Sequence, residues 1–160
     1  MGTRSRIGLS LGNGLATTIY CHWDGYPEHN GRILLESYRD NAKVAELISH
    51  GDMSSLRPKI NPSSEYHTFE NPEPDVCVFY HRDRDERLRI STIKEDKLWA
   101  YSGEEWNYLF KDNQWWFRRA GQTEWKLLTW VDCGAEEPMD ECVDLNAADI
   151  TSVFNTMMNV

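Results

Sequence analysis

Apolar and polar residues alternate through the first part of the chain. Apolar side chains occupy every second position over residues 7–11, and the alternation resumes over residues 15–23. Gly12-Asn13-Gly14 separates the two runs, and an Asn-Gly pair favours a hairpin turn because both residues tolerate positive φ. The pattern predicts two antiparallel strands joined by a tight turn.

Helical spacing follows over residues 31–40 and 41–51. Both segments place apolar residues three and four positions apart, which brings them onto one face of a helix. Asp40 or Asn41 can cap the second helix, and Gly51 can end it in the left-handed conformation. We therefore expect a short pair of helices after the hairpin.

A long loop and then a β-rich region are expected further along the chain. Residues 52–75 contain four prolines, which favour a loop. VCVFYH at 76–81 predicts a strand, and RDRDER at 82–87 predicts a charged turn. The short separators between the later segments favour an antiparallel meander. Its strands are expected at 88–93, 98–101, 106–110, 115–119 and 125–130.

Aromatic residues are concentrated in this meander. Trp106, Tyr108 and Phe110 are expected to share one face of a strand, with Asn107 and Leu109 on the other. The seven tryptophans of the chain are expected to form much of the hydrophobic interior of the sheet. An alternative use is an aromatic pocket that stacks a nucleotide or another planar ligand.

The C-terminal part completes a single α+β domain over residues 1–160. Residues 131–145 have no period and predict an acidic loop, whereas 146–160 place apolar residues at the spacing of an amphipathic helix. We expect a mainly antiparallel sheet of about six or seven strands, with the C-terminal helix packed on it. The parts are a hairpin plus helical pair (1–51), a loop (52–75), a β-meander (76–130), the acidic loop and the C-terminal helix.

Composition narrows the class of protein. Hydrophobic residues make up 40% of the chain and charged residues 27%, which is typical of a soluble globular domain. No apolar run approaches the ~20 residues that span a bilayer, and the N-terminus lacks the apolar stretch of a secretory signal. We expect a cytoplasmic protein without a membrane partner. Its four cysteines, Cys21, Cys77, Cys133 and Cys142, are expected to be free thiols.

Negative charge is concentrated at one end of the chain. Residues 127–160 contain seven acidic residues and neither Lys nor Arg, a formal charge of −7, whereas the preceding 126 residues carry only −2. Such a field disfavours direct binding of duplex DNA and favours a basic partner, although a loop of this kind can also serve only for solubility. The residues predicted to bind a partner are Asp132, Glu136, Glu137, Asp140, Glu141 and Asp144.

Residues 20–31, YCHWDGYPEHNG, concentrate chemically active side chains. Zinc could bind Cys21, His22 and His29 together with Cys77 and His81, since thiolate and imidazole are zinc ligands. In a strand, however, Cys77 and His81 would lie ~13 Å apart, too far to share one ion. Adjacent strand residues point to opposite faces, which also argues against Cys21 as a nucleophile activated by His22. We therefore predict neither a metal site nor a cofactor.

A structural corner explains the same residues. Asp24-Gly25 favours a turn, Pro27 restricts Tyr26 to extended conformations, and Asn30 can cap a helix that begins near Gly31. Three side chains remain candidates for contact with a ligand or partner. These are Trp23, Tyr26 and Glu28.

The N-terminal third contains a specific series of segments. These are, in order within about the first 56 residues, MGTRSRIG, IYCHWDGYPEHNG, ILLESYRD, KVAELI and GDMSSL. With this series the chain resembles a group of small, mostly uncharacterised proteins of tailed bacteriophages and prophages. WNYLF and WWF in the meander match loosely. The resemblance implies an accessory role directed at the bacterial host, including inhibition of restriction or CRISPR defences. It assigns no functional residue.

Three functional hypotheses follow. The leading one is a non-enzymatic phage protein of the host cytoplasm that binds and inhibits a bacterial host protein, a nucleic-acid-binding defence component, by covering it with the acidic surface. The second is a sponge that sequesters a nucleotide signal in an aromatic pocket. The third is a small metal-dependent enzyme built around His22, Asp24, His29 and His81.

Overall fold

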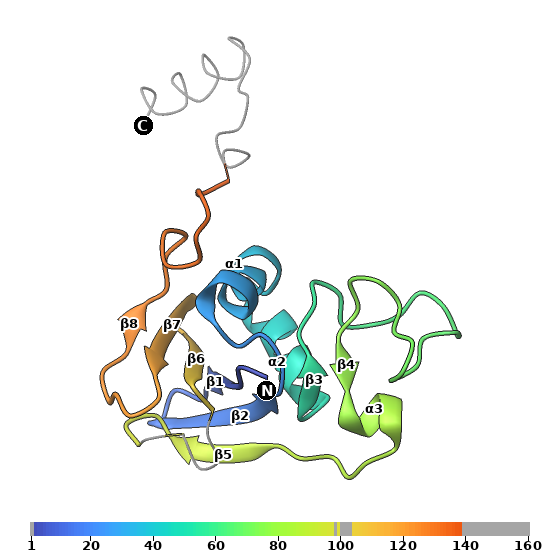
Figure 1. Ribbon diagram of the computed structural model, residues 1–160. Helices are drawn as coiled ribbons and strands as arrows, with labels where there is room; N and C mark the ends of the chain where they lie inside the picture. Colours follow the sequence, from blue (N-terminus) through green and yellow to red (C-terminus); the bar gives the residue numbers. More distant parts are fainter. Residues whose placement is uncertain (1, 98, 100–103, 139–160) are drawn as a thin grey trace, which may run out of the picture.

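The computed structural model describes residues 2–97, 99 and 104–138, and within these residues eight strands form one mixed sheet (Figure 1). The strand order is β4-β3-β2-β1-β6-β7-β8, and β5 pairs with the first half of β2. The strands are β1 (Ser5–Ser10), β2 (Leu15–Cys21), β3 (Met53–Ser55), β4 (Val78–Phe79), β5 (Ser91–Lys94), β6 (Trp106–Lys111), β7 (Gln114–Arg119) and β8 (Lys126–Leu127). The α+β class is therefore confirmed. The expected C-terminal helix lies outside the described residues.

The predicted first hairpin is confirmed. Strands β1 and β2 pair antiparallel, with Ile7 opposite Ile19. Positive φ falls on the two glycines of the turn, Gly12 and Gly14, at 82° and 81°. The Oδ1 of Asn13 between them accepts the Leu15 N–H. Local turn chemistry thus determines this part of the sheet.

Two pairings in the sheet are parallel, β1 with β6 and β2 with β3, while the other pairings are antiparallel. A parallel neighbour needs a crossover connection. Between β2 and β3 the chain forms a π-helical turn η1 (Pro27–Gly31) and the helices α1 (Arg32–Ser37) and α2 (Asn41–Ser49). The crossovers place residues that are distant in sequence side by side in the centre of the sheet.

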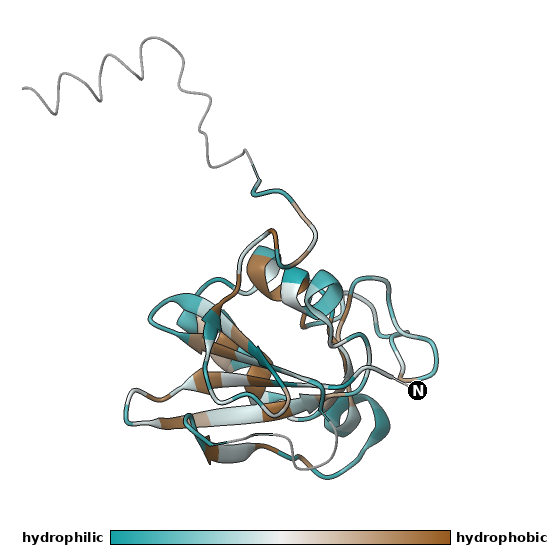
Figure 2. Ribbon diagram, turned by 60° about the vertical axis from the view of Figure 1, so that its left-hand side comes forward, coloured by the Kyte–Doolittle hydropathy of each residue, from teal (hydrophilic) through white to brown (hydrophobic). Residues whose placement is uncertain are grey.

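The predicted helical pair is confirmed and covers one face of the sheet (Figure 1). Asp40 caps α2 by accepting the Lys43 N–H at 2.8 Å, and Gly51 follows the helix with φ of 78°. Apolar residues alternate with polar ones along the strands, as Figure 2 shows, so each strand contributes one face to this core. The core includes Ile7, Ile19, Leu34, Val44, Leu47, Tyr108 and Phe110.

Residues 52–94 depart from the sequence-based expectation. The expected loop contains β3, the strand expected over VCVFYH is limited to β4, and the expected charged turn is replaced in part by helix α3 (Tyr80–Arg84). The Asp83 carboxylate accepts the Phe79 N–H at 2.8 Å, which satisfies a free donor at the start of this helix. Asp85 ends α3 in the left-handed conformation.

The predicted meander is confirmed for β6, β7 and β8, which pair in sequence. Asp112 and Asn113 join β6 to β7 and both have positive φ, as a type I′ hairpin turn requires. The last strand is shorter than expected and comprises only Lys126–Leu127. The strand expected at 98–101 lies almost entirely outside the described residues. Among the residues described, no helix is long and apolar enough to cross a membrane.

Candidate functional site

The YCHWDGYPEHNG segment forms a corner between β2 and α1. Asp24 adopts a φ of 57°, Gly25 donates its N–H to the Thr3 carbonyl at 2.7 Å, and Tyr26 is extended before Pro27. The turn and the extended entry are as predicted. Gly25 must lack a side chain here, because a Cβ atom would approach backbone atoms of Arg4 to within 2.8 Å.

The prediction that Asn30 caps a helix is wrong. The helical turn begins at Pro27, three residues earlier, so Asn30 lies inside η1 and is fully buried. Its Nδ2 donates to the Trp23 carbonyl at 3.2 Å and to Ser5 Oγ at 3.3 Å, while His29 Nδ1 lies 2.9 Å from its Oδ1. Asn30 therefore joins the corner to β1 from within the core.

The candidate metal ligands are engaged with other partners. Cys21 is fully buried, and burial raises the pKa of its thiol to about 12, so it is not poised to act as a thiolate. His22 Nδ1 lies 2.7 Å from the Tyr20 hydroxyl, and His81 Nδ1 lies 2.8 Å from the Glu86 carbonyl. No group of three or more His, Cys, Asp or Glu residues is placed to hold a metal ion in the described part of the chain.

Trp23, Tyr26 and Glu28 are all exposed, and we refer to them as the aromatic corner. The side chain of Trp23 is 43% exposed and that of Tyr26 36%, which is high for rings of this size. Contacts nevertheless hold both rings in place. The His22 and Trp23 rings pack in a T-shaped arrangement with their centroids 4.6 Å apart, and the Tyr26 hydroxyl donates to Asp24 Oδ1. The corner thus presents ordered aromatic area.

The acidic segment begins beside this corner. Cys133 is buried in the main core, and a Cβ atom at Gly31 would lie 3.3 Å from its Sγ, so the segment is anchored against η1. A Cβ atom at Gly134 would lie 3.6 Å from Glu28 Cγ. The structure therefore brings together the aromatic corner and the start of the acidic segment, which lie far apart in the sequence.

The six predicted acidic residues have different positions. Asp132 shapes a local turn, because its Oδ2 accepts both the N–H and the hydroxyl of Thr129. Glu136 and Glu137 are exposed. Asp140, Glu141 and Asp144 lie outside the described residues. Of the three predicted acidic residues that the structure describes, only Asp132 therefore has a structural role. Glu136 and Glu137 have none that the structure shows.

A second site, a polar groove, lies on the sheet face opposite the helices. It was not predicted from the sequence. It has a volume of about 560 Å³. Arg6 and Tyr20 alternate with the core residues Ile7 and Ile19, so they point away from the helices. Polar residues at alternate positions of the first two strands were the signal for this face. The groove is lined by Arg6, Tyr20, Asp52, Arg87, Leu88, Arg89, Ile90, Ser91 and Glu104.

Hydrogen bonds hold the floor of this groove. Arg6 Nη2 donates to Glu104 Oε1 at 2.8 Å, and the Glu104 side chain is fully buried. Arg6 Nη1 donates to Thr18 Oγ1. The Tyr20 N–H donates to Asp52 Oδ1 at 2.9 Å, and burial raises the pKa of Asp52 above its ordinary value. The floor is thus a partly desolvated set of charged groups.

The tryptophans are divided between the core and the surface. Trp99 and Trp115 are buried, as the packing role predicts, and Trp99 packs on the same sheet face as the groove. Trp116 and Trp125 are half-buried and line a small pocket of about 300 Å³ with Leu109 and Lys111. The indole N–H groups of Trp116 and Trp125 donate to backbone carbonyls, so only ring surface is available there.

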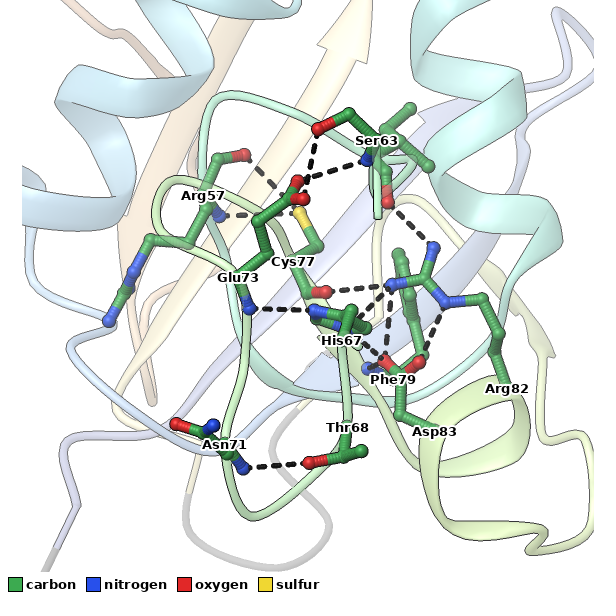
Figure 3. Close-up of polar contacts among 11 residues, drawn as sticks. Arg57, Ser63, His67, Thr68, Asn71, Glu73, Cys77, Phe79, Arg82 and Asp83 are labelled. Carbon is green, nitrogen blue, oxygen red and sulfur yellow. Dashed lines mark hydrogen bonds and ion pairs between the residues drawn. The ribbon is translucent and has the colours of Figure 1, made fainter. Parts of the chain in front are cut away.

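A third polar cluster surrounds His67 in the long loop (Figure 3). The Glu73 N–H donates to His67 Nδ1, which leaves the proton of the neutral ring on Nε2, 3.3 Å from Asp83 Oδ2. Arg82 donates to the same carboxylate and to the carbonyls of Ile60 and Cys77. The His67 and Asp83 side chains are only 2% and 5% exposed, so the cluster ties the loop to α3 and is closed to a substrate.

Comparison of the chain with protein-family models, with curated proteins and with solved structures found no match.

Proposed function

We propose that the protein acts by binding another protein through an acidic-aromatic surface formed by Trp23, Tyr26, Glu28, Glu136 and Glu137. The observation that carries the proposal is the proximity of Glu28 to Gly134, which joins the exposed aromatic corner to the acidic segment. Ordered aromatic rings supply contact area at low entropic cost, and aromatic residues are enriched in interfaces.

Charge defines the kind of partner. The segment from residue 127 onward carries −7, so its field attracts a basic surface and repels free nucleic acid. Complementary charges accelerate association and help to select the partner. A basic surface that normally holds nucleic acid fits both the charge and the phage-like N-terminal sequence. We therefore propose a nucleic-acid-binding host protein as the partner, with a defence component of the restriction or CRISPR type as the specific candidate.

Inhibition would follow from occupancy alone. A protein that covers a nucleic-acid-binding surface prevents access without any chemical step, so the acidic-aromatic surface needs no catalytic group. The anchoring of Cys133 in the core holds the start of the acidic segment in one place relative to Trp23 and Tyr26. Charge and aromatic area would then engage the partner together.

A charge-neutralising variant tests this proposal. The variant Glu28→Gln/Glu136→Gln/Glu137→Gln removes three charges from the surface, and Glu65→Gln/Glu70→Gln/Glu124→Gln removes three exposed charges from elsewhere. Tagged proteins are used for affinity capture from bacterial lysate at low and high salt, and captured proteins are identified by mass spectrometry. We expect a basic nucleic-acid-binding protein that is captured by wild type and the control, released by salt, and lost with the surface variant.

Two results would contradict the proposal. Equal capture by both triple variants would show that the surface charges do not matter. A captured partner that still binds its nucleic acid normally when saturated with this protein would remove the inhibitory role, while leaving the interaction itself intact.

A further inference from the structure

We propose that the polar groove binds a nucleotide, with the phosphate held by Arg87 and Arg89 and an N–H edge of the base held by Asp52. This ligand site is distinct from the acidic-aromatic surface, because its lining includes none of the residues of that surface.

The rim of the groove can bind an anion. Arg87 and Arg89 lie two residues apart on the exposed segment that enters β5, and both line the groove. Neither guanidinium makes an ion pair with any residue that the structure describes. Guanidinium groups bind phosphate oxygens through paired hydrogen bonds, and two of them in one groove fit a phosphate group better than a single carboxylate.

The backbone holds the two arginines beside the floor. The Asp52 N–H donates to the Arg89 carbonyl at 3.1 Å, and the Thr18 hydroxyl donates to the Ser91 carbonyl at 3.2 Å. Gly51 permits this close approach, since a Cβ atom there would lie 2.7 Å from Leu88 Cδ1. The two exposed arginine side chains therefore extend from a backbone that hydrogen bonds hold beside the floor.

The floor of the groove can accept hydrogen bonds. Only Oδ1 of Asp52 has a hydrogen-bond partner among the described residues, the Tyr20 N–H, so the carboxylate keeps free acceptor positions toward the groove. Glu104 is already paired with Arg6. A base that presents amino or ring N–H groups, as guanine does, matches the remaining acceptor capacity of Asp52.

Unpaired donors add positive potential beneath the groove. Arg4 Nε, Arg6 Nε and Asn107 Nδ2 are buried side-chain nitrogens that have no hydrogen-bond partner among the residues the structure describes. Arg6 and Asn107 are directly paired on neighbouring strands, and Arg4 precedes Arg6 by two residues on the same face. Such donors are uncommon in folded proteins and favour negative charge nearby. The volume of the groove also lies within the range of small-molecule sites.

Isothermal titration calorimetry with GMP, AMP, guanosine and inorganic phosphate tests the inference. We expect GMP or AMP to bind with one site per chain, and guanosine to bind at least tenfold more weakly than GMP. Arg87→Gln/Arg89→Gln should weaken GMP at least tenfold and leave guanosine unchanged. Asp52→Asn should weaken GMP and guanosine but not inorganic phosphate.

Arg119→Gln/Lys126→Gln is the matched control, since it removes two exposed positive charges outside the groove and should bind GMP as wild type does. Absence of GMP and AMP binding at millimolar concentration would overturn the inference. Nucleotide binding that survives both groove variants but is lost in Trp125→Leu would also overturn it, because the ligand would then occupy the tryptophan pocket. The arginine variant changes only exposed side chains, so its result does not depend on the folding of Asp52→Asn.

Discussion

The Arg118 Cζ atom lies 3.9 Å from the centroid of the Trp125 ring, on the sheet face opposite the helices, and Arg118 is only 1% exposed. Its nitrogens donate to Asn107 Oδ1 and to the carbonyls of Thr123 and Lys97, which joins β7 to two loops. Burial lowers the pKa of Arg118 to about 10, yet at neutral pH it stays charged. Carbonyl dipoles and aromatic faces hold this buried charge.

Replacement of Arg118 by methionine should therefore destabilise the fold. Methionine fills similar space but leaves the buried Asn107 Oδ1 and two partly buried carbonyls without this donor, and we expect a loss of about 2–4 kcal/mol in the free energy of unfolding. Urea denaturation followed by tryptophan fluorescence measures this loss. Arg119→Met, on the exposed neighbour, should change it by less than about 1 kcal/mol. Equal urea midpoints for the two variants would show that the buried hydrogen bonds contribute little.

Low pH should weaken the His67 cluster, because it protonates the Asp83 carboxylate. Burial alone would raise the pKa of this carboxyl, but hydrogen bonds from Arg82, the Phe79 N–H and His67 outweigh burial and lower it. A lowered pKa stabilises the fold above the ordinary Asp value of about 3.9, and this stabilisation is lost as pH falls through the lower value. Asp83→Asn should cost about 3 kcal/mol at pH 7.

The pH dependence of Asp83→Asn distinguishes the loss of the Asp83 charge from the loss of hydrogen-bond geometry. We expect the difference in free energy of unfolding between wild type and Asp83→Asn to shrink steadily as the pH falls below about 4. Urea titrations at several pH values measure that difference. A difference that stays constant with pH would assign the whole effect to lost hydrogen-bond geometry.

Elements with local signals could be predicted from the sequence. The first hairpin depends on Gly12 and Gly14, the start of α2 on the Asp40 side chain, and the β6–β7 turn on positive φ at Asp112 and Asn113. Each involves residues within a few positions of one another. Propensity and capping rules apply at this range, so these elements were predicted correctly.

Features that depend on distant residues could not be predicted in this way. The floor of the polar groove requires Arg6 to meet Glu104, 98 positions further along the chain. The parallel pairing of β1 with β6 brings them together, and no local pattern specifies that pairing. Asn30 was misassigned for a related reason, because its burial depends on contact with Ser5 across the corner.

The described cysteines should react slowly with a thiol reagent in the native state. Cys21, Cys77 and Cys133 are buried free thiols, and burial raises the pKa of each. Thiolate is the reactive form, so both access and ionisation are low at pH 8. In a Cys142→Ser background, we expect no fast reaction with Ellman's reagent under native conditions and reaction of all three thiols in denaturant. A fast native phase of one thiol would reveal an opening near that cysteine.

Asn30→Asp tests whether the buried corner depends on an amide donor. The change keeps the shape but replaces Nδ2, which donates to the Trp23 carbonyl and Ser5 Oγ, with a second acceptor in a fully buried position. At pH 7 the variant must either bury a charge or take up a proton, and we expect a loss of about 3 kcal/mol in the free energy of unfolding.

Because burial raises the pKa of such a carboxyl, the loss should be smallest below the ordinary Asp pKa of about 3.9 and should grow as pH rises through the higher value in the fold. Urea titrations at pH 4 and pH 7 measure the two losses. The control Asn71→Asp, at an exposed position of the long loop, should show little change at either pH. If Asn30→Asp lost the same stability at both pH values, the missing donor rather than the buried charge would account for the effect. No loss at either pH would mean that the corner folds without this amide.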